Sequence, residues 1–143
     1  MRESEESTTD DPGERVELER ALGVLGPLEA RIMRAVWTGV VAPPFTVHDV
    51  HDGMAELAYT TVLTTMRRLV DKGLLDAAAA VGRRSHHYRA CGDPAAFLAA
   101  QSDREATAVL ERYGDAALAA FAQRLEALTP QQREALARLR SSS

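Results

Sequence analysis

A helical repeat with an unusual polar face runs from Tyr59 to Gly73, and it constrains the fold more than any other stretch of the chain. Its large apolar residues follow the spacing i, i+1, i+4, i+7, i+8, which predicts a helix that buries one stripe. These residues are Val62, Leu63, Met66, Leu69 and Val70. The rest of the fold is expected to supply a core for this stripe and to leave the opposite side open.

That opposite side carries threonines and arginines in place of the glutamates and lysines of an ordinary solvated helix. Threonine occupies four of the six positions from 60 to 65, and Arg67 and Arg68 follow. Each β-branched threonine costs roughly a few tenths of a kcal/mol in helix propensity, so exposure to water alone does not explain the choice. Hydroxyl, methyl and guanidinium groups together suit the major groove of DNA. The alternative is a helix that merely tolerates threonine.

Two further helices are predicted before this one. Gly26-Pro27 is a typical helix entry, and the helix that it opens is expected to end at Gly39. Thr46 is a good N-cap for a second helix, whose apolar residues keep helical spacing over residues 47–57. Two short helices joined by a tight turn, the second with a polar contact face, form a helix-turn-helix.

A pair of strands is predicted after Gly73, over residues 74–81 and 86–89, with Gly82-Arg83-Arg84 at the turn between them. The alanines of the first segment favour a helix by propensity, but Gly73 ends the preceding helix and no large apolar face follows. Alone, the Gly-Arg-Arg sequence is typical of a solvated hairpin turn. Directly after a helix-turn-helix, it indicates the wing of a winged helix with two arginines at its tip.

The chain is therefore predicted to be mainly α (α+β), with a winged helix-turn-helix DNA-binding domain followed by C-terminal dimerisation helices. Residues 1–22 are expected to be a disordered acidic tail, residues 23–92 the winged helix, and residues 93–143 a helical dimerisation region. Short helices cannot bury their apolar stripes alone, so a homodimer is expected. The predicted dimerisation residues are Phe97, Leu110, Tyr113, Leu118, Phe121, Leu125 and Leu136.

The net charge of −4 conceals a basic middle segment. Residues 1–20 hold three basic and eight acidic side chains, whereas residues 25–90 hold eight basic and six acidic ones. Phosphate contact depends on local charge, so double-stranded operator DNA remains the predicted partner. The predicted DNA-binding residues are Thr46, Tyr59, Thr60, Thr61, Thr64, Thr65, Arg68, Lys72, Arg83 and Arg84.

Other classes of protein fit the sequence less well. There is no nucleophile elbow, glycine-rich phosphate loop or paired acid group, so no enzyme is expected. No signal peptide and no apolar run long enough to span a bilayer are present, which predicts a cytoplasmic protein with no membrane partner. A winged-helix module that binds proteins and no DNA remains an alternative.

A metal- or redox-responsive sensor is a second alternative. His48 and His51 are three residues apart on a predicted helix, and His86-His87 precede Cys91. Neighbouring strand residues point to opposite faces, and none of the fixed spacings of metal motifs is present, so no metal or other cofactor is predicted. Cys91 is the single cysteine, and Arg89 is the one nearby group that favours its thiolate.

Several motifs in order resemble the BlaI/MecI penicillinase-repressor family, strongly over residues 23–90 and by helical pattern over residues 91–140. They are Leu25-Gly26-Pro27-Leu28-Glu29, Met33 with Trp37, Ala58-Tyr59-Thr60-Thr61-Val62, Arg68-Leu69-Val70-Asp71-Lys72-Gly73-Leu74, and Gly82-Arg83-Arg84 with Tyr88. The resemblance implies a winged-helix repressor that dimerises through its C-terminal helices and binds a palindromic operator.

In several members of that family, cleavage between Asn and Phe in the C-terminal helices inactivates the repressor. This chain contains no asparagine, and Ala120 precedes Phe121. It also lacks the C-terminal Cys-x-Cys pairs of the copper-responsive relatives. Release from DNA is therefore expected to use a different input, and the sequence does not identify the operator, the target genes or the inducing signal.

Overall fold

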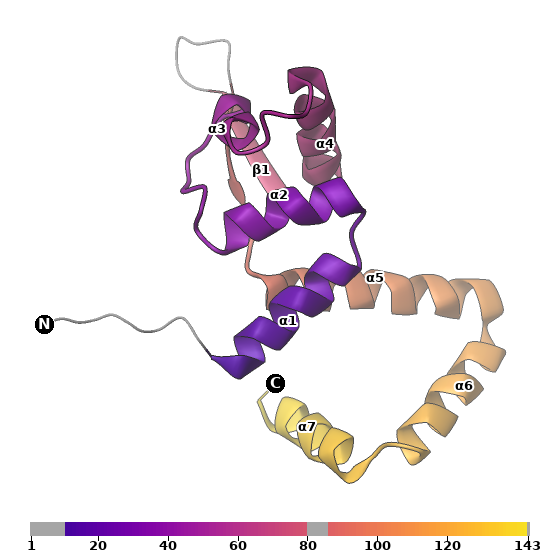
Figure 1. Cartoon of the computed structure of the whole chain (residues 1–143). Coiled ribbons are helices and arrows are strands. Elements are labelled where there is room, and N and C mark those ends of the chain that lie inside the picture. Colours follow the sequence, from indigo (N-terminus) through magenta and orange to yellow (C-terminus); the bar gives the residue numbers. More distant parts are fainter. Residues whose placement is uncertain (1–10, 80–85, 143) are drawn as a thin grey trace, which may run out of the picture. The chain divides into compact units, whose positions relative to one another are not determined.

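The computed structural model describes residues 11–79 and 86–142 and divides the chain into two compact units, one ending at Ala100 and the other beginning at Gln101. The first unit contains α1 (Pro12–Gly23), α2 (Pro27–Trp37), α3 (Val47–Asp52), α4 (Tyr59–Asp71), β1 (Leu75–Ala79) and β2 (His86–Ala90) (Figure 1). The helix α5 (Pro94–Tyr113) begins in this unit. In the described part of the chain, no helix is long and apolar enough to cross a membrane.

Local hydrogen bonds and backbone angles confirm the predicted starts of α2 and α3 and the predicted end of α4, whereas α3 ends at Asp52, short of residue 57. Gly26 is the N-cap of α2 with Pro27 in its first turn. The Thr46 side chain accepts a hydrogen bond from the backbone N–H of Asp49 at 3.2 Å, and the Asp49 carboxylate accepts from the Thr46 N–H at 2.8 Å. This reciprocal pair begins α3. Gly73 follows α4 with a φ of 81°, a left-handed conformation that glycine adopts without strain.

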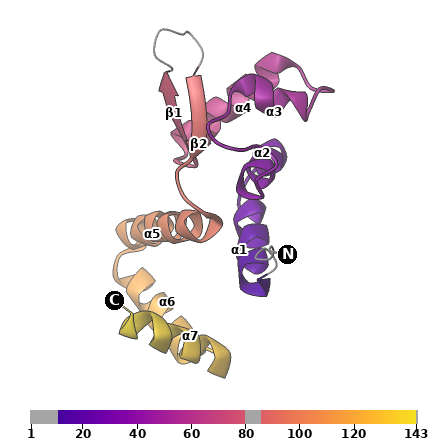
Figure 2. The same cartoon turned by 90° about the vertical axis from the view of Figure 1, so that its left-hand side faces the viewer.

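The two strands form an antiparallel pair beside α4, as predicted (Figure 2). Ala77 lies opposite Tyr88 in the register. Phe45 extends the pairing from the loop before α3, because its backbone exchanges two hydrogen bonds with Tyr88, at 3.0 and 2.7 Å. Arg83 and Arg84, the predicted tip of the wing, lie outside the described residues.

The core of the first unit forms where α2, α3, α4 and the strands meet. The predicted stripe of α4 is confirmed: Val62, Met66 and Leu69 are fully buried, while Leu63 and Val70 are partly buried against the same cluster. Other elements contribute Ile32, Met33, Phe45, Val50, Leu74 and Leu75. Burying one side of α4 in this way leaves its opposite side for contacts with a partner.

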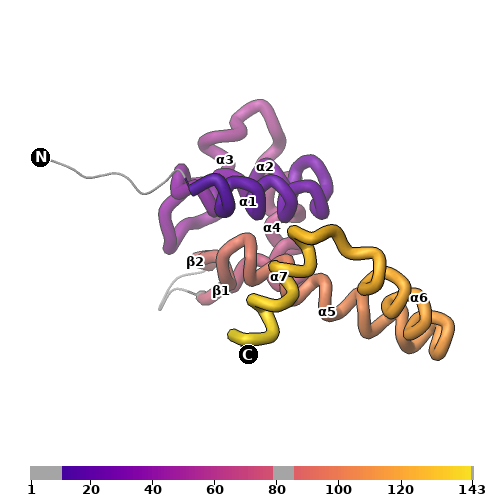
Figure 3. Tube along the Cα trace, turned by 90° about the horizontal axis from the view of Figure 1, so that it is seen from below, coloured from indigo at the N-terminus to yellow at the C-terminus, as the bar shows by residue number. Residues whose placement is uncertain are grey.

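The prediction of disorder is wrong for residues 12–22, which belong to α1. Asp11 caps this helix by accepting a hydrogen bond from the Gly13 N–H at 3.1 Å. Ala21 and Leu22 are buried, and α1 lies against α2 (Figure 3). The segment is acidic overall, but it contains a short apolar face. Burial of this face offsets the conformational entropy that is lost when the helix forms.

Two ion-paired side chains also join α1 to α2. The Arg34 guanidinium donates to both carboxylate oxygens of Glu19, at 2.8 and 3.0 Å. The hydrogen bond from Arg34 lowers the pKa of Glu19. Both side chains are about half exposed, so this pair orients α1 more than it stabilises the fold.

The second unit contains the rest of α5, α6 (Asp115–Glu126) and α7 (Pro130–Ser141). Of its described residues, Ala117 alone is buried. Four of the predicted dimerisation residues are exposed: Tyr113, Leu118, Phe121 and Leu125. Leu110 and Leu136 are half-buried. Among the described residues of this unit, Leu118, Phe121 and Leu125 therefore present apolar side chains to solvent, and such a surface is typical of a contact with another protein.

Phe97 is one of the predicted dimerisation residues, but its ring packs inside the first unit. It lies 6.1 Å from the Trp37 ring, measured between centroids, and it contacts the hydrophobic core. The first turns of α5 therefore belong with the winged helix, and the boundary between the units falls after Ala100 and not at the predicted residue 92.

Candidate nucleic-acid interface

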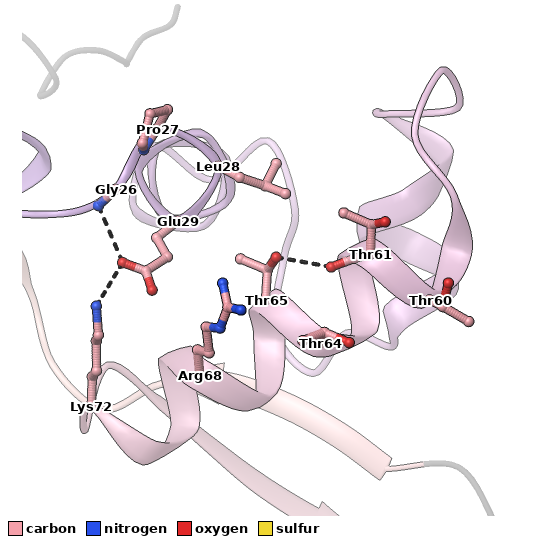
Figure 4. A pocket seen from close by; sticks show the side chains of 10 residues that line it. All are labelled: Gly26, Pro27, Leu28, Glu29, Thr60, Thr61, Thr64, Thr65, Arg68 and Lys72. Carbon is pink, nitrogen blue, oxygen red and sulfur yellow. Dashed lines mark hydrogen bonds and ion pairs between the residues drawn. The ribbon is translucent and has the colours of Figure 1, made fainter.

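The polar face of α4 borders an open cavity of about 560 Å³ at the N-terminus of α2 (Figure 4). Thr60, Thr61, Thr64 and Arg68 contribute from α4, and all four are exposed. The first turn of α2 supplies the facing wall. The structure thus brings together four of the predicted DNA-binding residues on one side of one helix.

Thr65 does not belong to this exposed face, contrary to the prediction. It is 3% exposed, and its hydroxyl donates a hydrogen bond to the carbonyl oxygen of Thr61 at 2.8 Å. Periodicity alone places Thr65 near the polar side, but α2 packs against this part of α4 and covers it. The back-bonded hydroxyl satisfies the buried oxygen, so Thr65 has a structural role.

Glu29 is a buried carboxylate beside the cavity, 6% exposed. The sequence identifies it only as a residue of the motif that begins α2. One of its oxygens accepts hydrogen bonds from the Lys72 ammonium at 2.9 Å and from the Gly26 N–H at 3.2 Å (Figure 4). Burial acts to raise the pKa of Glu29, but these hydrogen bonds and the charges of Lys72 and Arg68 outweigh it, so the pKa is lowered.

Lys72 therefore forms an ion pair with Glu29, although the sequence predicts that it contacts DNA. Its side chain is half exposed, and the ion pair connects the residue after α4 to the first turn of α2. A cation already neutralised by a carboxylate releases fewer counterions on binding phosphate. Its main effect in this structure is to fix α4 against α2.

We expect Glu29→Gln to lower the free energy of unfolding at pH 7 by about 1–3 kcal/mol, because a buried, charge-assisted hydrogen bond to Lys72 is lost. The folded pKa is depressed, so the stabilisation is present above the ordinary glutamate pKa of about 4.3 and is lost as pH falls through the folded value. Denaturant unfolding at several pH values measures this, and the difference between the two proteins should shrink in acid.

Glu19→Gln is the matched control for this prediction. It removes one carboxylate charge from an exposed ion pair with Arg34, so little change in stability is expected. A Glu29→Gln protein as stable as the wild type at neutral pH would show that the ion pair with Lys72 contributes nothing.

Two other predicted contact residues lie where α3 and α4 begin. The Thr46 hydroxyl is occupied by its capping bond to Asp49. Tyr59, 38% exposed, begins α4 with its ring 4.9 Å from the His48 ring and 5.8 Å from the His51 ring. The Nε2 atom of His51 lies 2.7 Å from the Leu57 carbonyl oxygen, to which it donates. These contacts position Tyr59 at the start of α4.

Neither sensor site considered from the sequence is assembled in the described part of the chain. No group of three His, Cys, Asp or Glu residues there could hold a metal ion. Cys91 is exposed, and burial, with the Asp76 charge adding to it, raises the pKa of its thiol, while Arg89 opposes the shift. A raised pKa lowers the thiolate fraction and with it the reactivity toward oxidants.

Comparisons with known proteins identify a family. The family model described as penicillinase repressor matches residues 25–141. No curated protein matches the chain. Similar solved structures include a point mutant of S. aureus MepR, with 14% identity over 82% of this chain and 91% of that chain, at a TM-score of 0.44.

Two further structures resemble the chain at a similar level. One is a transcriptional regulator with 24% identity over 91% of this chain and 87% of that one, at a TM-score of 0.46. The other is a MarR/EmrR family transcriptional regulator from Acinetobacter sp. ADP1, with 16% identity, coverages of 88% and 89%, and a TM-score of 0.41. The family model spans most of the sequence. The chain belongs to the penicillinase repressor family and is a winged-helix, DNA-binding regulator of transcription.

Proposed function

We propose that the protein represses transcription by binding a palindromic operator as a homodimer, with the exposed face of α4 in the major groove. The observation that supports this most directly is the exposure of Thr60, Thr61, Thr64 and Arg68 along one side of α4. The opposite side of the same helix is buried in the core. A helix oriented in this way can offer hydroxyl, methyl and guanidinium groups to base edges.

The apolar surface of the second unit supports the homodimer. Its exposed side chains include Leu118, Phe121 and Leu125, which recur on one face of α6 at positions i, i+3 and i+7. A second copy of the same surface would cover them in a symmetric contact. Two winged helices held together then read two half-sites, which is the reason for a palindromic operator.

The wing completes the proposed interface. Arg83 and Arg84 remain the predicted phosphate contacts, on the argument from their place between two strands that follow a helix-turn-helix. Phosphate contacts of this kind fix the register of a protein on the duplex, while the α4 side chains select the sequence.

Thr64→Ala is expected to change the order of preference among operator variants. The substitution removes one hydroxyl and one methyl group from the exposed face of α4, and a base contact of this kind is worth about 1–3 kcal/mol, or roughly fivefold or more in relative affinity. Competition binding with a set of single-base operator variants measures the shift. Thr107→Ala, at an exposed position of α5, is the control and should leave the preferences unchanged.

The experiment that tests the proposed function is a footprint of the purified protein on the DNA upstream of its own coding sequence. We expect protection of two symmetric half-sites about one helical turn apart. Uniform binding without a protected site would contradict a sequence-specific operator. No binding even at low salt would contradict DNA binding altogether and would favour a protein-interaction module.

A further inference from the structure

A second open cavity, of about 630 Å³, lies in the first unit and away from the polar face of α4. Its walls come from α1, the C-terminal end of α2 and the N-terminal end of α5. This volume falls within the range of about 300–1,000 Å³ that is typical of sites for small molecules. The α1 wall lies outside residues 25–141, which the family model matches.

The cavity has an apolar floor around one fixed aromatic ring. Leu18, Trp37 and Pro94 line it, and each is half-buried. The Trp37 indole N–H donates to the Gly92 carbonyl oxygen at 2.9 Å, and its ring packs beside Phe97. Since the N–H is already paired, the ring offers the cavity only its apolar surface and its π electrons.

The rim of the cavity is mainly acidic. Glu14 and Glu17 extend from α1, Asp93 precedes α5, and Arg15 is the one cationic residue among those that line it. One oxygen of Asp93 accepts the capping hydrogen bond from the Ala96 N–H at 2.8 Å. Three carboxylates against one guanidinium above an apolar floor favour a ligand with a positive charge and an apolar body.

We propose that this cavity binds a small hydrophobic cation, with the apolar body against Trp37, Leu18 and Pro94 and the charge near Glu14 and Glu17. A cation over the face of tryptophan gains from the ring quadrupole, and this gain increases when water is excluded. The ligand would be an onium compound with aromatic or branched aliphatic groups. The site is separate from the face of α4 that is proposed to contact DNA. A test of ligand binding in this cavity therefore does not depend on the proposed operator.

Trp37 is the only tryptophan of the chain, so its fluorescence reports directly on this cavity. We would titrate the full-length protein with tetraphenylphosphonium and, separately, with tetraphenylborate, which has nearly the same shape and the opposite charge. The expected result is saturable quenching by the phosphonium with an affinity about tenfold or more above that of the borate. Equal affinities, or quenching by the phosphonium that never saturates, would overturn the proposal.

The double substitution Glu14→Gln, Glu17→Gln tests the charge of the rim and keeps its shape. We expect it to weaken phosphonium binding by about tenfold and to narrow the gap to the borate, because two nearby carboxylates are removed. Glu126→Gln, Glu134→Gln changes the net charge equally at exposed positions of the second unit and should bind as the wild type does. The proposal would be overturned if the Glu14→Gln, Glu17→Gln protein bound the phosphonium as tightly as the wild type. It would also be overturned if the two double variants lost the same affinity for the phosphonium.

Discussion

Arg68→Ala is expected to weaken binding to the operator about 30-fold or more, because each copy in the proposed dimer loses a base contact worth about 1–3 kcal/mol. Arg68 is exposed in the last turns of α4 and lines the cavity beside the threonines. The planar guanidinium can form two parallel hydrogen bonds with the O6 and N7 atoms of guanine. Affinities for operator and for random DNA, at several salt concentrations, measure the effect as a specificity ratio.

Two further variants separate charge from recognition. Arg68→Lys keeps the charge but loses the planar fork of donors, so the specificity ratio should fall while the salt dependence is retained. Arg67→Ala removes the neighbouring charge from a side of α4 that borders Asp71 and Tyr88, so binding to all DNA should weaken alike. If Arg68→Ala leaves the specificity ratio at its wild-type value, α4 does not read the operator as proposed.

Much of the first unit could be predicted from the sequence because its signals are local. Gly26-Pro27, the Thr46 cap and Gly73 each act within one turn of the chain, and the structure places helix ends at all three. The apolar repeat of α4 was equally informative, since a 3.6-residue period fixes which side is buried. Even the alanine-rich strand β1 could be predicted, because the glycine after α4 ends that helix, although the helix propensity of alanine favours a helix there.

The predictions failed where a distant partner decides the outcome. The α1 helix depends on burial of Ala21 and Leu22 against the rest of the unit, and its acidic composition favoured disorder. Thr65 is covered by α2, which a helical period cannot show. The pairing of Glu29 with Lys72 joins residues 43 positions apart. Its only local signal was an acidic residue three positions after Gly26, the pattern of a capping box.

Phe121→Asp is expected to produce a monomer whose operator affinity is lower by about two to four orders of magnitude, because the second half-site is no longer bound intramolecularly. Phe121 is 37% exposed and lies between Leu118 and Leu125 on the apolar face of α6. Burying an unpaired carboxylate in the contact between two copies would cost more free energy than the apolar contact contributes. Sedimentation of the full-length protein at tens of micromolar, followed by operator titration, measures both effects.

A point substitution tests the dimer more cleanly than truncation at Gly92 would, because that truncation also removes Phe97 and with it the contact to Trp37 in the first unit. Gln123→Asp is the matched control, since it introduces the same charge on the opposite side of α6 from the apolar face. It should stay dimeric and bind the operator as the wild type does. Two results would contradict the proposed dimer: a wild-type protein that is monomeric at this concentration, or a Phe121→Asp protein that remains dimeric. In either case the apolar face of α6 does not hold the two copies together. The proposal of a palindromic operator would then have no structural support.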